Sequence, residues 1–254
     1  MTPDDFLNSQ HHISFAIGDY QLVLGQPSST LIVGLLSAIY IYFAMLFFRS
    51  LREQQSRKYW SAGLFFSALA SLVAGLYYQL LGFHIRCEGL NQCYATSAWE
   101  IFYYLLTCLA SFCFFSAIVW AMVSQRSRRF FFLWGLACCG CYLIGLGVGV
   151  GFEISYLLSF QFSVMMTLIL IFPIVILNLN RLLLRPRALD RVLLHSSLML
   201  LLSSAVYFAY SNFGITEFLW RHSLWLSEND VLHLSLIFWV LYLNPRLLKV
   251  MRDG

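Results

Sequence analysis

The sequence predicts an all-α membrane protein, a polytopic bundle of seven transmembrane helices, and three observations predict it. Hydrophobic residues make up 60% of the 254 residues, charged residues only 11%, and the mean hydropathy is +0.73. Such values lie outside the range of soluble globular proteins. The apolar residues are gathered into seven stretches, each close to the roughly 20 residues that a helix needs to cross a bilayer. The basic residues cluster in alternate connections between these stretches.

The predicted spans follow one another with short connections. They cover residues 28–48, 60–83, 97–123, 130–151, 154–178, 191–212 and 229–244. They divide the chain into an N-terminal segment outside the membrane (1–27), a seven-helix membrane domain (28–246) and a short cytoplasmic tail (247–254). Only a tight turn near Glu153 separates the fourth and fifth spans, so a re-entrant arrangement is the alternative to two full helices there.

The basic residues predict the orientation of the chain. Of the 16 Lys and Arg residues, 14 follow the first, third, fifth or seventh span, and only Arg86 and Arg221 follow an even-numbered span. Because Lys and Arg are enriched in cytoplasmic loops, the N-terminus is predicted outside and the C-terminus in the cytoplasm. The first 48 residues contain no Lys or Arg, so no removable signal peptide is expected. A bacterial inner membrane is the expected location, and the basic residues are assigned to the lipid bilayer surface rather than to nucleic acid.

The seven cysteines fall into two groups. Cys87 and Cys93 lie in the loop HIRCEGLNQCYA, where an oxidising exterior would join them in a disulfide bond. A metal site formed with His84 is the alternative, since Cys and His are zinc ligands. The remaining cysteines lie within predicted spans and are expected to pack as small apolar residues: Cys108, Cys113, Cys138, Cys139 and Cys141.

Two features within the spans bear on helix shape and packing. The glycines of GLGVGVG (145–151) pair at a spacing of four, which lets a neighbouring helix approach closely. The stretch lacks the preceding strand and the following Lys of a phosphate-binding loop. Pro173 lies within LILIFPIVIL and is expected to kink the fifth span, because proline has no backbone N–H.

Polar residues near the outer ends of three spans form the candidate functional site. In SENDVLHL, at the start of the seventh span, Asn229, Asp230 and His233 share one helical face. Asp230 or Asn229 could orient the imidazole, or His233 could help to hold a metal.

Ionisable residues inside a membrane are costly and often functional, and Glu100 lies about one turn inside the third span. The alternatives are a carboxylate that reaches the headgroups and a chance clustering of polar residues at an interface. Four neighbours reach the same depth: Trp99 from the third span, and Tyr77, Tyr78 and Gln79 from the second.

This arrangement resembles the seven-span superfamily of the alkaline ceramidases and the progestin and adipoQ receptors. The resemblance implies a zinc hydrolase site with a Ser and a His on the second span, an acid near the third and a His-x-x-x-His pair on the seventh. His233 matches the second histidine of that pair, and Glu100 could stand for the acid. The other positions differ, with Asn229, Tyr78 and Ala74 in place of the two histidines and the serine. The resemblance therefore implies a member that keeps the bundle without the complete zinc site.

Three functions are compatible with these patterns. The first is an outer-leaflet pocket of the second, third and seventh spans that binds a lipid or amphipathic ligand. If it is an enzyme, it would be an amide or ester hydrolase with His233 as base or metal ligand. The second is a non-enzymatic seven-span sensor that signals through a separate protein partner. The third is a transporter, disfavoured because no internal repeat is found. A retinal cofactor is excluded because the seventh span has no lysine for a Schiff base.

Overall fold

A computed structural model describes the chain except residues 9–11, 19, 51–52, 95 and 185 and the side chains of Tyr20 and Tyr78. In the described residues, seven helices are long and apolar enough to cross a membrane, as in an integral multi-pass membrane protein. The prediction of seven spans is confirmed. The helices are α2 (Pro27–Arg49), α3 (Gln55–Val73), α5 (Ala98–Met122), α6 (Gln125–Gly151), α7 (Phe160–Leu184), α8 (Ala188–Asn212) and α10 (Glu228–Val250).

The ends of several helices differ from the predicted span ends. Helix α7 begins and ends six residues later than the predicted fifth span, 154–178. Helix α10 continues through Pro245 to Val250, although the predicted seventh span ends at residue 244. Hydrophobicity marks where a chain meets lipid, whereas a helix can continue beyond the apolar stretch. Helices α6 and α7 each have full spanning length, and Glu153 in the turn between them adopts a positive φ of 55°.

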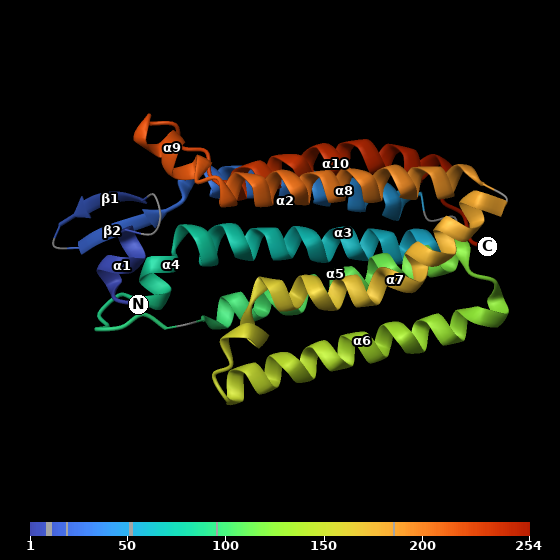
Figure 1. Cartoon of the computed structure of the whole chain (residues 1–254), viewed down its shortest axis with the longest axis horizontal. Helices are drawn as coiled ribbons and strands as arrows, with labels where there is room; N and C mark the ends of the chain where they lie inside the picture. The colour runs from blue at the N-terminus through green and yellow to red at the C-terminus, as the bar shows by residue number, and fades with distance from the viewer. Residues whose placement is uncertain (9–11, 19, 51–52, 95, 185) are drawn as a thin grey trace.

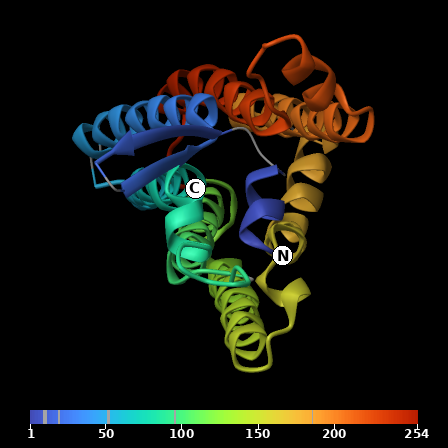
Figure 2. The same ribbon diagram turned by 90° about the vertical axis from the view of Figure 1, so that its left-hand side faces the viewer.

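Six of the spanning helices form a closed ring, and α6 lies outside it. Neighbours pack in the order α2, α3, α5, α7, α8 and α10, and α10 returns to α2. Helix α6 packs mainly against α5 and α7, and it stands at the edge of the bundle in the end view of Figure 2. The two chain ends lie at opposite ends of the bundle (Figure 1), which we call the N-terminal end and the C-terminal end.

The largest apolar core lies among α2, α3, α5, α8 and α10. Phe47, Leu64, Val240 and Leu247 are almost completely buried there. Helices α2 and α3 approach each other closely, as helix pairs with small side chains commonly do in membranes. Two serine hydroxyls donate hydrogen bonds across this interface to backbone carbonyls. These hydrogen bonds run from Ser37 to Ala68 at 2.9 Å and from Ser61 to Ala44 at 2.8 Å.

The second span ends in a π-helix, η1 (Ala74–Leu80), which continues α3. A π-helix is a widened turn that is frequently found at functional sites. On α2, the Thr30 hydroxyl donates to the Gly75 carbonyl at 3.2 Å. A Cβ at Gly75 would lie 3.3 Å from the Val33 side chain, so glycine permits this close approach. The stretch that supplies Tyr77, Tyr78 and Gln79 is therefore a π-helix packed on α2.

The N-terminal segment folds into a small cap at the N-terminal end. It contains α1 (Pro3–Asn8) and the antiparallel strands β1 (His12–Ile17) and β2 (Tyr20–Gly25). The sequence analysis predicted no strands, although HISFAIGDYQLVLG alternates and carries Gly18 (φ +62°) at its turn, a hairpin signal. The cap packs on α4 (Gly82–Arg86), where the backbone N–H of Val23 donates to His84 Nε2 at 2.9 Å.

The disulfide between Cys87 and Cys93 is confirmed. It closes the loop that follows α4, and the backbone N–H of Cys93 donates to the Met1 carbonyl at 3.0 Å. His84, the proposed partner in the alternative metal site, uses both ring nitrogens elsewhere. Its Nδ1 lies 2.9 Å from Glu88 Oε2, and its Nε2 accepts from Val23. The disulfide therefore fixes the loop against the N-terminal cap.

The glycine stretch packs on one of its two faces. A Cβ at Gly145 would lie 2.6 Å from the Phe162 ring, and one at Gly149 would lie 2.9 Å from Leu157 in the short helix η2 (Ser155–Leu158). No atom lies within 4 Å of a Cβ built at Gly147 or Gly151. The predicted close packing is therefore confirmed for Gly145 and Gly149. Pro173 lies inside the continuous helix α7, and the kink expected there stays a prediction.

Candidate functional site

Asp230 joins the first turns of α10 and α2. Its side chain is completely buried. The carboxylate accepts hydrogen bonds from the hydroxyls of Ser29 at 2.5 Å and Ser28 at 3.1 Å, both on α2. It also accepts from the backbone N–H of Ser227 at 2.8 Å, while the Ser227 hydroxyl accepts from the Asp230 N–H, which completes a capping box. The carboxylate is therefore engaged in holding two helix ends together.

His233 and Asn229 lie on the same helix but form no side-chain pair with Asp230 in the described structure. The Nδ1 of His233 is buried and forms no hydrogen bond with a side chain there, and the imidazole lies near the Asn229 backbone on its own helix. Asp230 turns its carboxylate toward α2, so it does not orient the imidazole. In the described residues no group of three or more His, Cys, Asp and Glu is placed to hold a metal ion. Zinc binding at His233 stays a prediction.

Glu100 is also buried near the start of its helix. Its carboxylate accepts from the Thr96 hydroxyl at 2.9 Å, and its backbone N–H donates to Ser97, the N-cap of α5. The neighbouring Trp99 stacks on Tyr77 from η1, with ring centroids 3.9 Å apart and planes 8° apart. Glu100 and this ring stack therefore lie where η1 meets α5.

The polar residues predicted to form one site belong to two helix interfaces. Tyr77 and Trp99 join η1 to α5, whereas Asp230 joins α10 to α2. In the described structure, no hydrogen bond, ion pair or ring stack links the two groups. Gln79 is 6% exposed, with a buried Oε1 that has no partner there. The side chain of Tyr78 lies outside the described part. A single pocket of all these residues stays a prediction.

A large cavity lies elsewhere, inside the helix ring toward the C-terminal end. Its volume is about 210 Å³, and it is bounded by α3, α5, α7, α8 and α10. Most of its wall is apolar, and its polar side chains are one amide, four hydroxyls and two indoles. The lining residues are Trp60, Ser111, Phe114, Phe115, Ile118, Thr167, Ile171, Ile174, Val175, Asn178, Leu193, Ser196, Ser197, Leu200 and Trp239.

Asn178 is a buried polar residue of this wall. Its side chain is 6% exposed, and Nδ2 donates to the backbone carbonyl of Asp190 at 3.4 Å. The amide oxygen Oδ1 is buried without a hydrogen-bond partner in the described structure. A buried acceptor without a partner costs about 1–3 kcal/mol. Asn178 therefore gives the cavity an acceptor that a bound molecule could satisfy.

The hydroxyls of the wall are largely occupied. Ser196 accepts a hydrogen bond from the indole of Trp239 at 2.9 Å, which joins α8 to α10. Ser197 donates to the Leu193 carbonyl and Thr167 donates to the Ser163 carbonyl, each within its own helix. Two of the four hydroxyl protons of the wall, those of Ser197 and Thr167, are therefore committed to backbone carbonyls.

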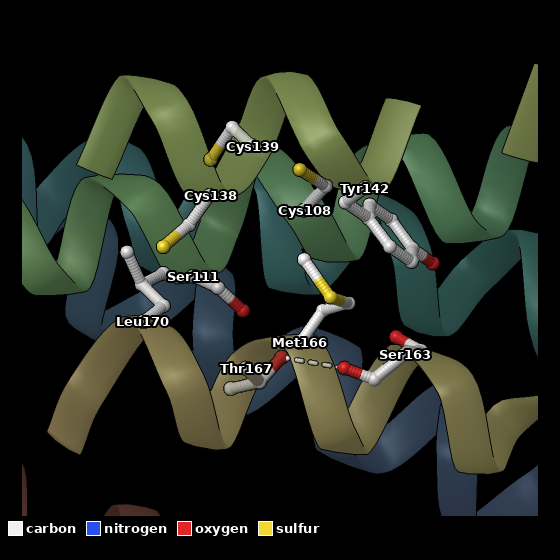
Figure 3. A pocket seen from close by; sticks show the side chains of 9 residues that line it. All are labelled: Cys108, Ser111, Cys138, Cys139, Tyr142, Ser163, Met166, Thr167 and Leu170. Carbon is white, nitrogen blue, oxygen red and sulfur yellow. Dashed lines mark hydrogen bonds between the residues drawn. The ribbon is translucent and has the colours of Figure 1, made fainter. Parts of the chain in front are cut away.

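A much smaller cavity of about 20 Å³ adjoins the larger one between α5, α6 and α7. Ser111 and Thr167 line both. Figure 3 shows the thiols of Cys108, Cys138 and Cys139 reaching into the space between α5 and α6. These cysteines line a cavity, although the sequence analysis expected only packing.

Asn178 was not predicted as a site residue because the end of one helix was predicted too early. The predicted fifth span ended at residue 178, which placed Asn178 at the membrane surface, where a polar residue needs no explanation. Helix α7 continues to Leu184, so Asn178 lies six residues inside it. A polar residue near a span end, followed by LNRLLL without a helix breaker, was the available signal.

Comparisons of this chain with protein-family models, with curated proteins and with solved structures find no match.

Proposed function

We propose that this protein binds one lipid-like amphipathic molecule inside its helix bundle. The observation that carries the proposal is the cavity of about 210 Å³ with an apolar wall and an amide oxygen on Asn178 that is buried without a partner in the described structure. Ligand sites are typically concave and mostly apolar, with a few polar groups that fix orientation. A molecule with an apolar chain and one polar head has the chemistry that matches this wall.

The proposal includes an orientation in the membrane. The 14 basic residues beside the odd-numbered span ends support a cytoplasmic C-terminal end and an N-terminal cap outside, in a bacterial inner membrane. In this orientation the cavity lies in the cytoplasmic half of the bilayer. The pocket predicted from the sequence lies at the opposite, outer end of the bundle.

Binding is favoured over hydrolysis by the contacts of the predicted catalytic residues. Asp230 uses its carboxylate to hold α2 and α10 together, and His233 has no side-chain partner on its own helix. A general base needs a partner that sets its tautomer and orientation. We therefore propose a non-enzymatic binding protein, and a signalling role would require a separate partner.

Bound lipid retained during purification tests this function. Protein extracted in a mild detergent is analysed intact by native mass spectrometry, and we expect one bound lipid per chain. In Ser197→Phe the new ring should fill the cavity from α8, so we expect no bound lipid in the mass spectrum. Ser197 lines the wall, and its hydroxyl forms a hydrogen bond only within its own helix.

Leu201→Phe is the matched control, since Leu201 lies one turn further along α8 and is 67% exposed. It should retain the bound lipid. Equal retention by the two variants, or no bound mass in any protein, would overturn the proposal.

A further inference from the structure

The cavity wall carries no formal charge. None of its lining residues is Asp, Glu, Lys or Arg. The nearest cation along α7 is Arg181, three residues beyond Asn178. Its Nε lies 3.4 Å from Asp190 Oδ1, and its Nη1 donates to the Met122 carbonyl at 2.8 Å. The buried Asp190 balances the charge of this guanidinium, although Arg181 Nη2 is buried without a hydrogen-bond partner in the described structure. Arg181 does not line the cavity, so an anionic headgroup there would meet no unpaired cation in the wall.

The orientation of the Asn178 amide is fixed by its surroundings. Its Nδ2 faces the Asp190 carbonyl at 3.4 Å. A flipped amide would place two acceptor oxygens together at that position. Oδ1 therefore remains the atom without a partner, and it requires a donor. Thr167 and Ser197 already donate to backbone carbonyls, and no hydroxyl of the described wall donates to Oδ1.

The depth of Asn178 suits the head of a lipid. It lies six residues from the last residue of α7, about 9 Å along the helix axis. Thr167, at the other end of the cavity, lies eleven residues away, about 16 Å toward the middle of the helix. The wall between them is apolar on α7, at Ile171 and Ile174. A chain anchored at Asn178 would therefore extend toward the middle of the bundle.

We infer that the ligand is a neutral lipid with a hydroxyl headgroup, which donates a hydrogen bond to Asn178 Oδ1 while its chain fills the cavity toward Thr167. A carboxylate or phosphate would place a charge and a further acceptor beside the unpaired Oδ1, in a wall without charged residues. An ether or ester head would leave Oδ1 unpaired. The inference rests on the proposed function and specifies its ligand class.

Three probes that differ only in their heads test this inference. They are oleyl alcohol, its methyl ether and oleic acid, each with a photoactivatable diazirine in the chain. Protein in nanodiscs is irradiated with increasing amounts of each probe, and labelled peptides of α7 and α8 are quantified by mass spectrometry. We expect half-saturation at about tenfold lower concentration for the alcohol than for the ether, the usual effect of one buried hydrogen bond.

Variants assign the preference to the amide oxygen. Asn178→Leu should raise the half-saturation of the alcohol to that of the ether. Asn180→Leu, an exposed asparagine two residues further along α7, should leave the alcohol preference unchanged. If Asn178→Leu does not fold, the comparison of the three probes on the unaltered protein still tests whether a hydroxyl headgroup is preferred.

The outcomes separate the two proposals. Equal labelling by all three probes, or strongest labelling by the acid, overturns the hydroxyl head and leaves lipid binding standing. Labelling of the unaltered protein no greater than that of Ser197→Phe overturns lipid binding itself, and the cavity then holds water alone.

Discussion

At the scale of single residues, the polar side chains of the spans are explained by their hydrogen-bond partners more than by their positions in the sequence. Asp230 and Asn178 are both buried residues of spanning helices. Asp230 accepts from two serine hydroxyls and a backbone N–H, whereas Asn178 retains an acceptor without a partner. The satisfied residue holds the fold together, and the unsatisfied one is available to a ligand.

Replacement of Asp230 by alanine should destabilise the protein strongly. It removes the acceptor of Ser28, Ser29 and the Ser227 N–H. Hydrogen bonds to a charged group contribute about 1.5–3 kcal/mol each, and a lost cap adds about 1 kcal/mol. We expect a loss of at least about 3 kcal/mol, measured by unfolding in mixed micelles. Asn229→Ala, which removes no described side-chain hydrogen bond, should change stability by less than about 0.5 kcal/mol. Equal effects would contradict the tethering role.

Replacement of His233 should leave the metal content unchanged. No described residues complete a group of three ligands around it, and tetrahedral zinc sites take three or four protein ligands. Zinc bound to the purified protein and to His233→Ala is measured by elemental analysis, and we expect equal values. A stoichiometric loss of zinc in the variant would restore the hydrolase hypothesis.

At the scale of elements, helix faces decide which glycines matter. Gly149 is buried against Leu157 and Leu158, whereas Gly147, two residues away, meets nothing within 4 Å. Both occur in the same repetitive sequence, so the spacing alone could not separate them. The contact is made by η2, which approaches α6 after the turn at Glu153.

Alanine at these two glycines should change stability in opposite directions. In Gly149→Ala the new methyl would lie 2.9 Å from the Leu157 Cβ, and such overpacking typically costs about 1–3 kcal/mol. Gly147→Ala adds no contact and should gain up to about 1 kcal/mol from helix propensity. Thermal unfolding of the two variants in one detergent measures the difference. A stabilising Gly149→Ala would show that α6 does not pack there.

The elements were predicted with unequal success, for physical reasons. The seven predicted apolar stretches correspond to the seven spanning helices of the described residues, because a bilayer requires a minimum length of apolar helix. The ends of α7 and α10 were missed, because chains such as LNRLLL and NPRLLKV continue as helix beyond the hydrocarbon. Cys87 and Cys93 were paired correctly because their loop is short. The continuation of α7 beyond Asn178 had a signal in the sequence, but the cavity itself had none, because it depends on which helices are neighbours in the ring.

At the scale of the whole molecule, the ring of six helices leaves α6 packed mainly on α5 and α7 (Figure 2). The chain crosses the bundle an odd number of times, so the N-terminal cap and the C-terminal residues lie at opposite ends (Figure 1). The two ends differ in charge, since most basic residues lie at the C-terminal end. This asymmetry is the basis for the proposed orientation.

Labelling of intact cells tests the orientation. A cysteine is introduced at Ser223, between α9 (Ile215–Arg221) and α10, or at Ser127, in the first turn of α6. Both positions are exposed and lie at opposite ends of the bundle. A membrane-impermeant maleimide should label Ser223→Cys and leave Ser127→Cys at the background of the parent chain. The reverse pattern would invert the proposed orientation.

The two indoles in the cavity wall make its occupancy visible to spectroscopy. Trp60 on α3 donates its N–H to Asn244, and Trp239 on α10 donates its N–H to Ser196. A chain that carries bromine atoms quenches tryptophan emission at short range. Brominated oleyl alcohol should therefore reduce the tryptophan fluorescence of the protein. The double variant Trp60→Phe and Trp239→Phe should lack the part of this fluorescence loss that saturates at low probe concentration. The protein carries its own optical reporter of whether the space inside it is filled.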